Sequence, residues 1–103
     1  MYLTMNRFKV KLGQEAAFEE VWTARDSHLR SVPGFKAFHL LKGEEQDGYR
    51  LYASHTMWET EAHFHAWTRS EAFREAHKDA GSNKDLYLGP PDLEVFETVQ
   101  ELS

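Results

Sequence analysis

The apolar residues along this chain change their period, and this change most limits the folds open to it. Residues 2–11 alternate between two faces, as a half-buried strand does, and Asn6 shares one face with Phe8. Apolar side chains then recur every three or four residues, which predicts an amphipathic helix over about 14–31. A Pro-Gly pair at 33–34 ends that helix.

Two more strands and two short helices are predicted to follow. The strands cover residues 35–42 and 49–58, joined by a polar hairpin connection at 43–48. Each helix begins after a hydroxyl side chain that can cap it, Thr60 for the first and Ser70 for the second.

A long loop at 80–92, which contains glycine and proline, leads to a predicted last strand over 93–102. The order is βαββαβ, the ferredoxin-like pattern of an α+β fold. At 103 residues, the chain is expected to form a single domain over 1–103.

Helices of a ferredoxin-like fold cover one face of the sheet, yet the middle strands here are apolar on both faces. The apolar residues that point in opposite directions are Phe35 and Leu41 against Phe38 and Leu40, and Leu51 and Met57 against Tyr52 and Trp58. A sheet that is apolar on both sides needs a second cover, so the sequence predicts a homodimer.

Composition excludes several classes of function. The net charge of −5 and the lack of a basic stripe argue against nucleic-acid binding. The chain has no cysteine, which fits a reducing compartment and excludes thiolate chemistry. No apolar run is long enough for a signal peptide or a membrane span. We therefore expect a cytoplasmic protein that binds neither nucleic acid nor membrane.

Asn6 is the first candidate functional residue. Asparagine is a poor strand former, and such local conflicts tend to lie at functional sites. A buried carboxamide needs hydrogen-bond partners, and its NH2 group could donate to bound dioxygen. From the residues alone, a hydrogen bond to neighbouring backbone is the more frequent explanation.

Trp67 and His77 are the other two candidates. On a helix, Trp67 shares a face with Phe64, and His77 shares a face with Phe73. A neutral imidazole placed in this way could ligate iron. Position alone, however, favours a core residue for Trp67 and a surface residue for His77.

Other functional patterns are missing from the sequence. No HExxH motif or Cys/His cluster indicates a zinc site, and no glycine-rich loop follows a strand, so flavin or nicotinamide binding by this chain is not expected. The large aromatic residues Phe18, Trp22 and Trp58 are assigned to the core, and the less favoured alternative is that one of them lines the pocket.

Two segments carry a family resemblance. They are the opening MNRFKVKLG at 5–13 and the run AHFHAWTRSEAFREAH at 62–77. With them the chain resembles the antibiotic-biosynthesis-monooxygenase superfamily and, within it, the Isd-type heme-degrading monooxygenases. The resemblance implies a dimeric α+β barrel that binds heme b between sheet and helices. Heme would be both substrate and cofactor, opened with O2 and electrons from an external reductase or small reductant, with release of iron.

The resemblance also implies residue roles. His77 would be the axial ligand of the heme iron, Asn6 the amide beside the bound oxygen, and Trp67 the residue that distorts the porphyrin. Arg25 corresponds to a basic position that could pair with a propionate. The two aromatic residues that would contact heme are Phe64 and Phe73.

Three alternatives remain at this point. One is a heme carrier or sensor with the same site but no turnover. Another is a cofactor-free quinol monooxygenase of the same superfamily, which needs no iron ligand. The third is a plain dimerisation module.

Overall fold

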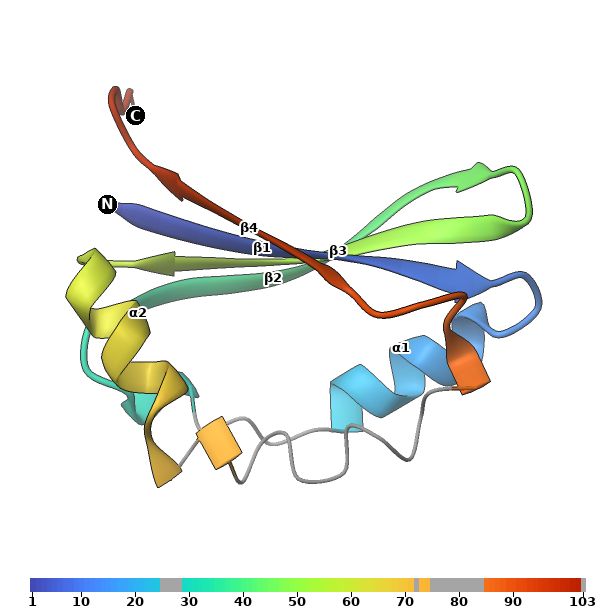
Figure 1. Cartoon of the computed structure of the whole chain (residues 1–103), viewed down its shortest axis with the longest axis horizontal. Helices are drawn as coiled ribbons and strands as arrows, with labels where there is room; N and C mark the ends of the chain where they lie inside the picture. The colour runs from blue at the N-terminus through green and yellow to red at the C-terminus, as the bar shows by residue number, and fades with distance from the viewer. Residues whose placement is uncertain (25–28, 72, 75–84, 103) are drawn as a thin grey trace.

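The computed structural model describes residues 1–24, 29–71, 73–74 and 85–102. Its elements are β1 (Tyr2–Lys11), α1 (Glu15–Ala24), a 3₁₀ turn η1 (Leu29–Ser31), β2 (Phe35–Gln46), β3 (Tyr49–Trp58), α2 (Glu61–Thr68) and β4 (Asp92–Glu97). The strands form one antiparallel sheet in the order β2-β3-β1-β4. Both helices lie under the same face of the sheet, toward its opposite ends (Figure 1). The predicted ferredoxin-like α+β fold is confirmed.

The central strand β1 has the predicted alternation. It pairs with β3 on one side and with β4 on the other. Its even-numbered residues face the helices, and Tyr2, Phe8 and Val10 among them are buried. Asn6 lies on this same helix-covered face, between Thr4 and Phe8, as the alternation predicts.

The hairpin between β2 and β3 is tighter than predicted. Strand β2 extends through most of the expected connection, and Gln46 already pairs with Tyr49. The connection is therefore the two residues Asp47 and Gly48, and Gly48 has a positive φ of 87°. Asp-Gly is a preferred pair for two-residue hairpin loops, because glycine accepts the left-handed backbone that the turn requires.

The faces of β2 also correct the prediction. A register shift lies between Phe35 and Ala37, so alternation alone assigns Phe35 to the wrong face. Phe35 packs edge-on against Trp58, and Phe38 stacks on Trp22, so both point toward the helices. A β-bulge inserts one extra residue, so the side chains before it point to the opposite face from the one that strict alternation predicts.

The first helix is shorter than the predicted 14–31. The structure describes α1 as far as Ala24, and residues 25–28 lie outside the described part. Leu29–Ser31 form a 3₁₀ turn, in which the Val32 amide donates to the Leu29 carbonyl over 3.0 Å. Pro33 disfavours the α conformation at Val32, so a helix is not expected to continue past this turn.

The last strand is also shorter than the predicted 93–102. Strand β4 ends at Glu97, which pairs with Tyr2, and the amide of Thr98 makes a last bond to the carbonyl of Met1. Val99 and Leu102 are 97% and 85% exposed. Tyr2 is the first residue of β1, and the residues after Thr98 pair with no strand of the described sheet.

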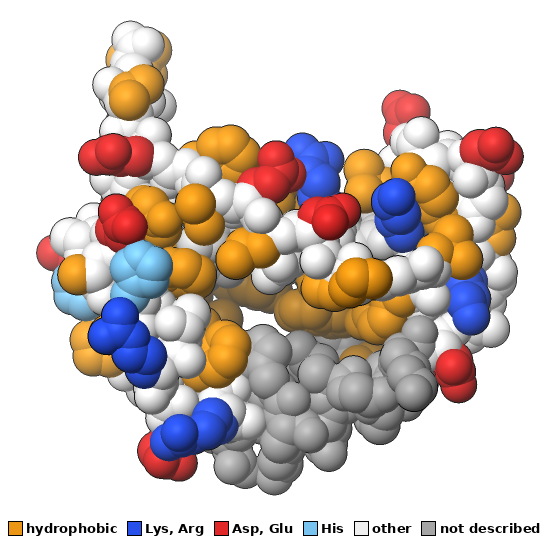
Figure 2. Space-filling view, in the orientation of Figure 1, with side chains coloured by type: hydrophobic (Ala, Val, Ile, Leu, Met, Phe, Trp, Pro, Cys, Tyr) orange, Lys and Arg blue, Asp and Glu red, His pale blue; other side chains and the backbone are white. Residues whose placement is uncertain are grey.

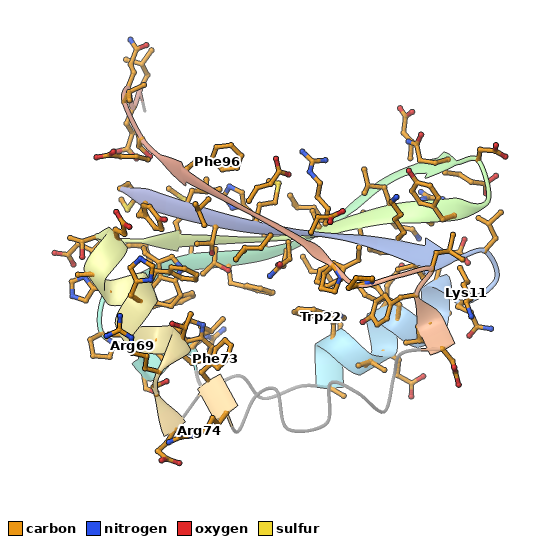
Figure 3. All side chains as sticks on the ribbon, in the orientation of Figure 1. Lys11, Trp22, Arg69, Phe73, Arg74 and Phe96 are labelled. Atoms are coloured by element: carbon orange, nitrogen blue, oxygen red, sulfur yellow. The ribbon has the colours of Figure 1, made fainter. Side chains whose placement is uncertain are left out.

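The sheet face opposite the helices carries apolar side chains. Figure 3 shows Phe96 pointing away from both helices, and in the single chain Phe96 is 46% exposed and Leu41 is 42% exposed. The Arg7–Glu94 ion pair lies on the same face. Among the described residues, no helix is long and apolar enough to span a membrane.

Candidate functional site

A cavity of about 480 Å³ lies between the sheet and the two helices. Figure 2 shows the hollow, with hydrophobic side chains at its back. All four strands contribute to its lining, together with α1, η1, α2 and the turn that follows α2. Small-molecule sites typically measure roughly 300–1,000 Å³ and are mostly apolar, so this cavity has the size and character of one.

Aromatic side chains form the walls. They come from different elements: Trp22, Phe38, Trp58, Phe64, Trp67 and Phe73. Trp22 stacks on Phe38 with ring centroids 6.0 Å apart, and Phe73 meets Trp67 edge-on at 5.4 Å. In Figure 3, Trp22 and Phe73 lie below the sheet, on the α1 and α2 sides of the molecule respectively. Flat walls of this kind suit a flat, apolar ligand.

The floor of the cavity, formed by β1 and β3, is polar. Asn6 lies directly opposite Ser54, and Thr4 lies directly opposite Thr56. All four residues line the cavity, and Ser54 is only 5% exposed. The indole nitrogen of Trp58 donates to Thr4 Oγ1 over 3.3 Å. The floor thus offers hydrogen bonds at the centre of an aromatic enclosure.

Two hydroxyl caps fix the aromatic wall on the α2 side. The Thr60 hydroxyl accepts from the His63 amide over 3.2 Å and begins α2, as predicted. The Ser70 hydroxyl donates to the Trp67 carbonyl over 2.7 Å and accepts from the Phe73 amide over 3.1 Å. Ser70 therefore joins the end of α2 to the next helical turn and sets Trp67 against Phe73.

Gly34 lets α2 approach the sheet closely. Its φ is +82°, and a Cβ atom there would lie 2.2 Å from His63 Cγ. The Gly34 carbonyl also accepts a hydrogen bond from the Glu59 amide over 2.8 Å, just before the helix begins. Glycine is required at this position both for the backbone conformation and for the space.

The described lining of the cavity carries no charged side chain. It supplies hydrogen-bond donors and acceptors, together with apolar contact. Elsewhere, no three His, Cys, Asp or Glu side chains among the described residues form a group that could hold a metal ion. The chemistry available from these walls is positioning and polarisation of a bound reactant.

The structure brings together most of the site residues predicted from sequence. The same cavity is lined by four of them: Asn6, Phe64, Trp67 and Phe73. Arg25 and His77, the predicted propionate partner and iron ligand, lie outside the described residues. Their roles stay predictions.

Sequence reasoning missed part of the lining. Trp22 and Trp58 were assigned chiefly to the core; Trp58 is indeed buried, and both residues also border the cavity. Ser54 and Thr56 were not singled out at all. A signal was present: alternation in 49–58 puts both hydroxyls on the same face as Trp58, where polar residues are unexpected.

Comparison with known proteins identifies the family to which this chain belongs. Residues 1–79 match the antibiotic biosynthesis monooxygenase family. A heme oxygenase (staphylobilin-producing) of Staphylococcus haemolyticus is 32% identical over 83 residues, which cover 77% of this chain and 75% of that protein. A heme-degrading monooxygenase of Shouchella clausii is 43% identical over 56 residues, which are 54% of this chain and about half (52%) of that protein.

A solved structure agrees over the full length of both chains. The heme degrader MhuD of Mycobacterium tuberculosis, solved with two hemes bound in its active site, is 25% identical and superposes with a TM-score of 0.74 over 100% of each chain. On the family match and these relatives, the chain belongs to the antibiotic biosynthesis monooxygenase family.

Proposed function

We propose that this protein is a heme-degrading monooxygenase. It binds heme b as substrate and cofactor, and it opens the porphyrin with O2 and electrons from an external reductase, which releases iron. The observation that carries the proposal is the convergence of Asn6 and Trp67 on one aromatic-walled cavity, in a chain related to heme-degrading proteins.

The described residues have separate tasks in this proposal. Bound heme supplies the iron that activates dioxygen and the ring that is oxidised. Phe64 and Phe73 contact the faces or edges of the ring and exclude water, since both belong to the apolar wall. The Asn6 carboxamide donates from the polar floor to the reacting oxygen. The Trp67 indole, which is buried at the cavity wall, would press on the porphyrin and distort it.

Two further roles fall on residues outside the described part of the chain. In the proposal, His77 is the axial ligand of the iron and Arg25 pairs with a propionate. His77→Ala tests the first role: the ferric protein should lose its histidine-ligated absorption spectrum while its circular dichroism stays unchanged. An unchanged histidine-ligated spectrum in the variant would assign the iron to another residue.

The proposed assembly is a homodimer in the cytoplasm. A second copy of the chain would cover the sheet face that carries Leu41 and Phe96, which are substantially exposed in the single chain. A buried apolar interface is the usual solution for such a face. Sedimentation velocity on the purified protein measures this directly, and a monomer at micromolar concentration would contradict it.

Hemin titration is the primary test of function. Addition of hemin to the purified protein should shift the Soret band, with an endpoint of one heme per protomer. A reductant and air should then bleach the Soret band and release iron that a ferrous chelator captures. Binding without bleaching would identify a carrier or sensor. Oxidation of a quinol in the absence of any bound heme would identify a cofactor-free oxygenase.

A further inference from the structure

Asn6 has one polar neighbour and one apolar neighbour across the sheet. In β3 it lies directly opposite Ser54, and in β4 directly opposite Leu93. Residues that face each other in an antiparallel pair have Cβ atoms about 4.5–5.5 Å apart, so a serine hydroxyl can reach an asparagine carboxamide. Leu93 offers only carbon. Among the cross-strand partners of Asn6, Ser54 is therefore the side chain that can hydrogen-bond to it.

A carboxamide in a donor role must have its NH2 end fixed. The oxygen and nitrogen ends of asparagine have nearly the same shape, so apolar packing cannot distinguish them. A half-turn about the last side-chain torsion exchanges a donor for an acceptor. A hydroxyl that donates to Oδ1 removes this ambiguity, because it holds the oxygen and leaves the NH2 group toward the cavity.

The other hydroxyls of the floor are less suited to this task. Thr4 already accepts from the Trp58 indole over 3.3 Å. Thr56 lies opposite Thr4, so it is only a diagonal neighbour of Asn6. Diagonal neighbours lie about 7–8 Å apart, beyond the reach of a threonine hydroxyl. Ser54 is also buried, at 5% exposure, so its hydroxyl gains from a protein partner.

We propose that Ser54 is a positioning residue: its hydroxyl donates to Asn6 Oδ1 and thereby turns the Asn6 NH2 group toward the reacting oxygen. This inference rests on the proposed function. Ser54 lines the cavity, but the proposal assigns it no hydrogen bond to the reacting oxygen and no part in proton transfer. It also predicts that the effect of Ser54 passes through Asn6 alone.

The test is a double-mutant cycle on heme-saturated protein. Measured at hemin saturation, Ser54→Ala should slow single-turnover degradation up to about tenfold, the effect of losing one neutral hydrogen bond. Ser54→Thr, which keeps the hydroxyl, should restore most of the rate. In the Asn6→Ala background, Ser54→Ala should cause no further loss, because the two residues act as one unit. Thr56→Val is the matched comparison, and its effect should add to that of Asn6→Ala.

A spectroscopic readout separates positioning from general structural damage. In the ferrous carbon monoxide complex, a donor that faces the ligand lowers the C–O stretching frequency. Ser54→Ala should therefore shift this band in the same direction as Asn6→Ala, or split it into two amide orientations, and Ser54→Thr should return it. Circular dichroism and urea unfolding of each variant verify that the fold is kept.

The outcomes are distinguishable. A wild-type rate and a wild-type C–O band in Ser54→Ala would overturn the positioning role, and so would additive losses in the double mutant. Failure of the wild-type protein to bind hemin would instead overturn the proposed function. If the wild type binds heme but does not degrade it, the carbon monoxide band still decides the role of Ser54.

Discussion

The helix-covered face of the sheet carries aromatic residues at both of its ends, but one end is a closed core and the other borders the cavity. Under α1, the buried residues Phe8, Val10, Phe18 and Tyr52 form a closed core. Phe18 and Tyr52 approach to 4.5 Å between ring centroids. Toward α2, the buried Tyr2, Trp58 and Trp67 form a second cluster, and the two tryptophans of this cluster border the cavity. Aromatic content alone therefore does not distinguish a core from a pocket.

The stretch before β4 covers the aromatic cluster at the α1 end. Leu86 and Tyr87, from the stretch before β4, pack onto the α1 end. Tyr87 bridges to Val10, and the Leu88 amide donates to the Lys9 carbonyl over 2.9 Å. The predicted loop at 80–92 thus contributes core residues in its described part. Among the described residues, these contacts lie at the α1 end, and the cavity lies beyond them over Asn6 and Ser54.

The largest expected effect compares a core phenylalanine with a wall phenylalanine. Phe18 is fully buried in the closed end, so Phe18→Ala should lower the free energy of unfolding by about 3–5 kcal/mol. Phe73 is only partly buried beside the cavity, so Phe73→Ala should cost less stability and should weaken hemin affinity. Urea unfolding and hemin titration of both variants check this. Equal losses of stability would mean that the two ends are packed alike.

The next effect separates binding from turnover within the cavity. Asn6→Ala removes a donor from the floor and little volume, so hemin affinity should stay near the wild-type value. The single-turnover rate should fall about a hundredfold, which corresponds to roughly 3 kcal/mol for one preorganised donor. Stopped-flow measurement with a chemical reductant gives the rate. Degradation at the wild-type rate with normal binding would remove Asn6 from the reaction.

A smaller effect is expected from a change that reduces, but keeps, the aromatic ring that we propose presses on the porphyrin. Trp67 lines both the main cavity and a second hollow of about 190 Å³, so Trp67→Ala would disturb packing around both. Trp67→Phe avoids this. Its single-turnover rate should fall between those of the wild type and Trp67→Ala, by about tenfold, or roughly 1.4 kcal/mol. A rate equal to the wild type would show that ring size at this position does not matter.

Periodicity predicted the faces well where a strand runs without a bulge. Asn6 and the aromatic residues of β1 are on the expected face because side chains in a strand alternate strictly. The helix caps at Thr60 and Ser70 were also predicted correctly, because a cap depends on local hydrogen bonds. The order of helices and strands along the chain could be predicted from these local patterns.

Features that depend on a neighbouring strand could not be predicted in the same way. The register shift after Phe35 and the end of β4 at Glu97 are set by where the partner strand offers hydrogen bonds. The cavity depends on the separation of α1 and α2, which no periodicity encodes. For this reason Trp22 and Trp58 were assigned to the core although both border the cavity.

The smallest expected effect concerns the closed end alone and depends on pH. The Tyr52 hydroxyl donates to Glu19 Oε2 and ties β3 to α1, while Lys42 Nζ lies 3.1 Å from the same carboxylate oxygen. The hydrogen bond from Tyr52, followed by that from Lys42, lowers the pKa of Glu19 below its ordinary 4.5. Burial, followed by the hydrogen bond to Glu19, raises the pKa of Tyr52 above its ordinary 10.0.

The signs of these two shifts set a window. A lowered carboxyl pKa stabilises the fold above pH 4.5, and this contribution is lost as the pH falls through the lowered value. A raised phenol pKa stabilises the fold below pH 10.0, and its contribution is lost as the pH rises through the raised value. Tyr52→Phe removes the contribution of the phenol and the part of the Glu19 contribution that comes from the Tyr52 hydrogen bond, while the part from Lys42 remains. The stability difference between wild type and variant should therefore be constant between these limits and shrink in acid.

Urea unfolding at a series of pH values measures this difference. Tyr49→Phe is the control, because it removes a hydroxyl from the same strand outside the cluster. A difference that stays constant well below pH 4.5 would mean that the pKa of Glu19 does not depend on the Tyr52 hydroxyl.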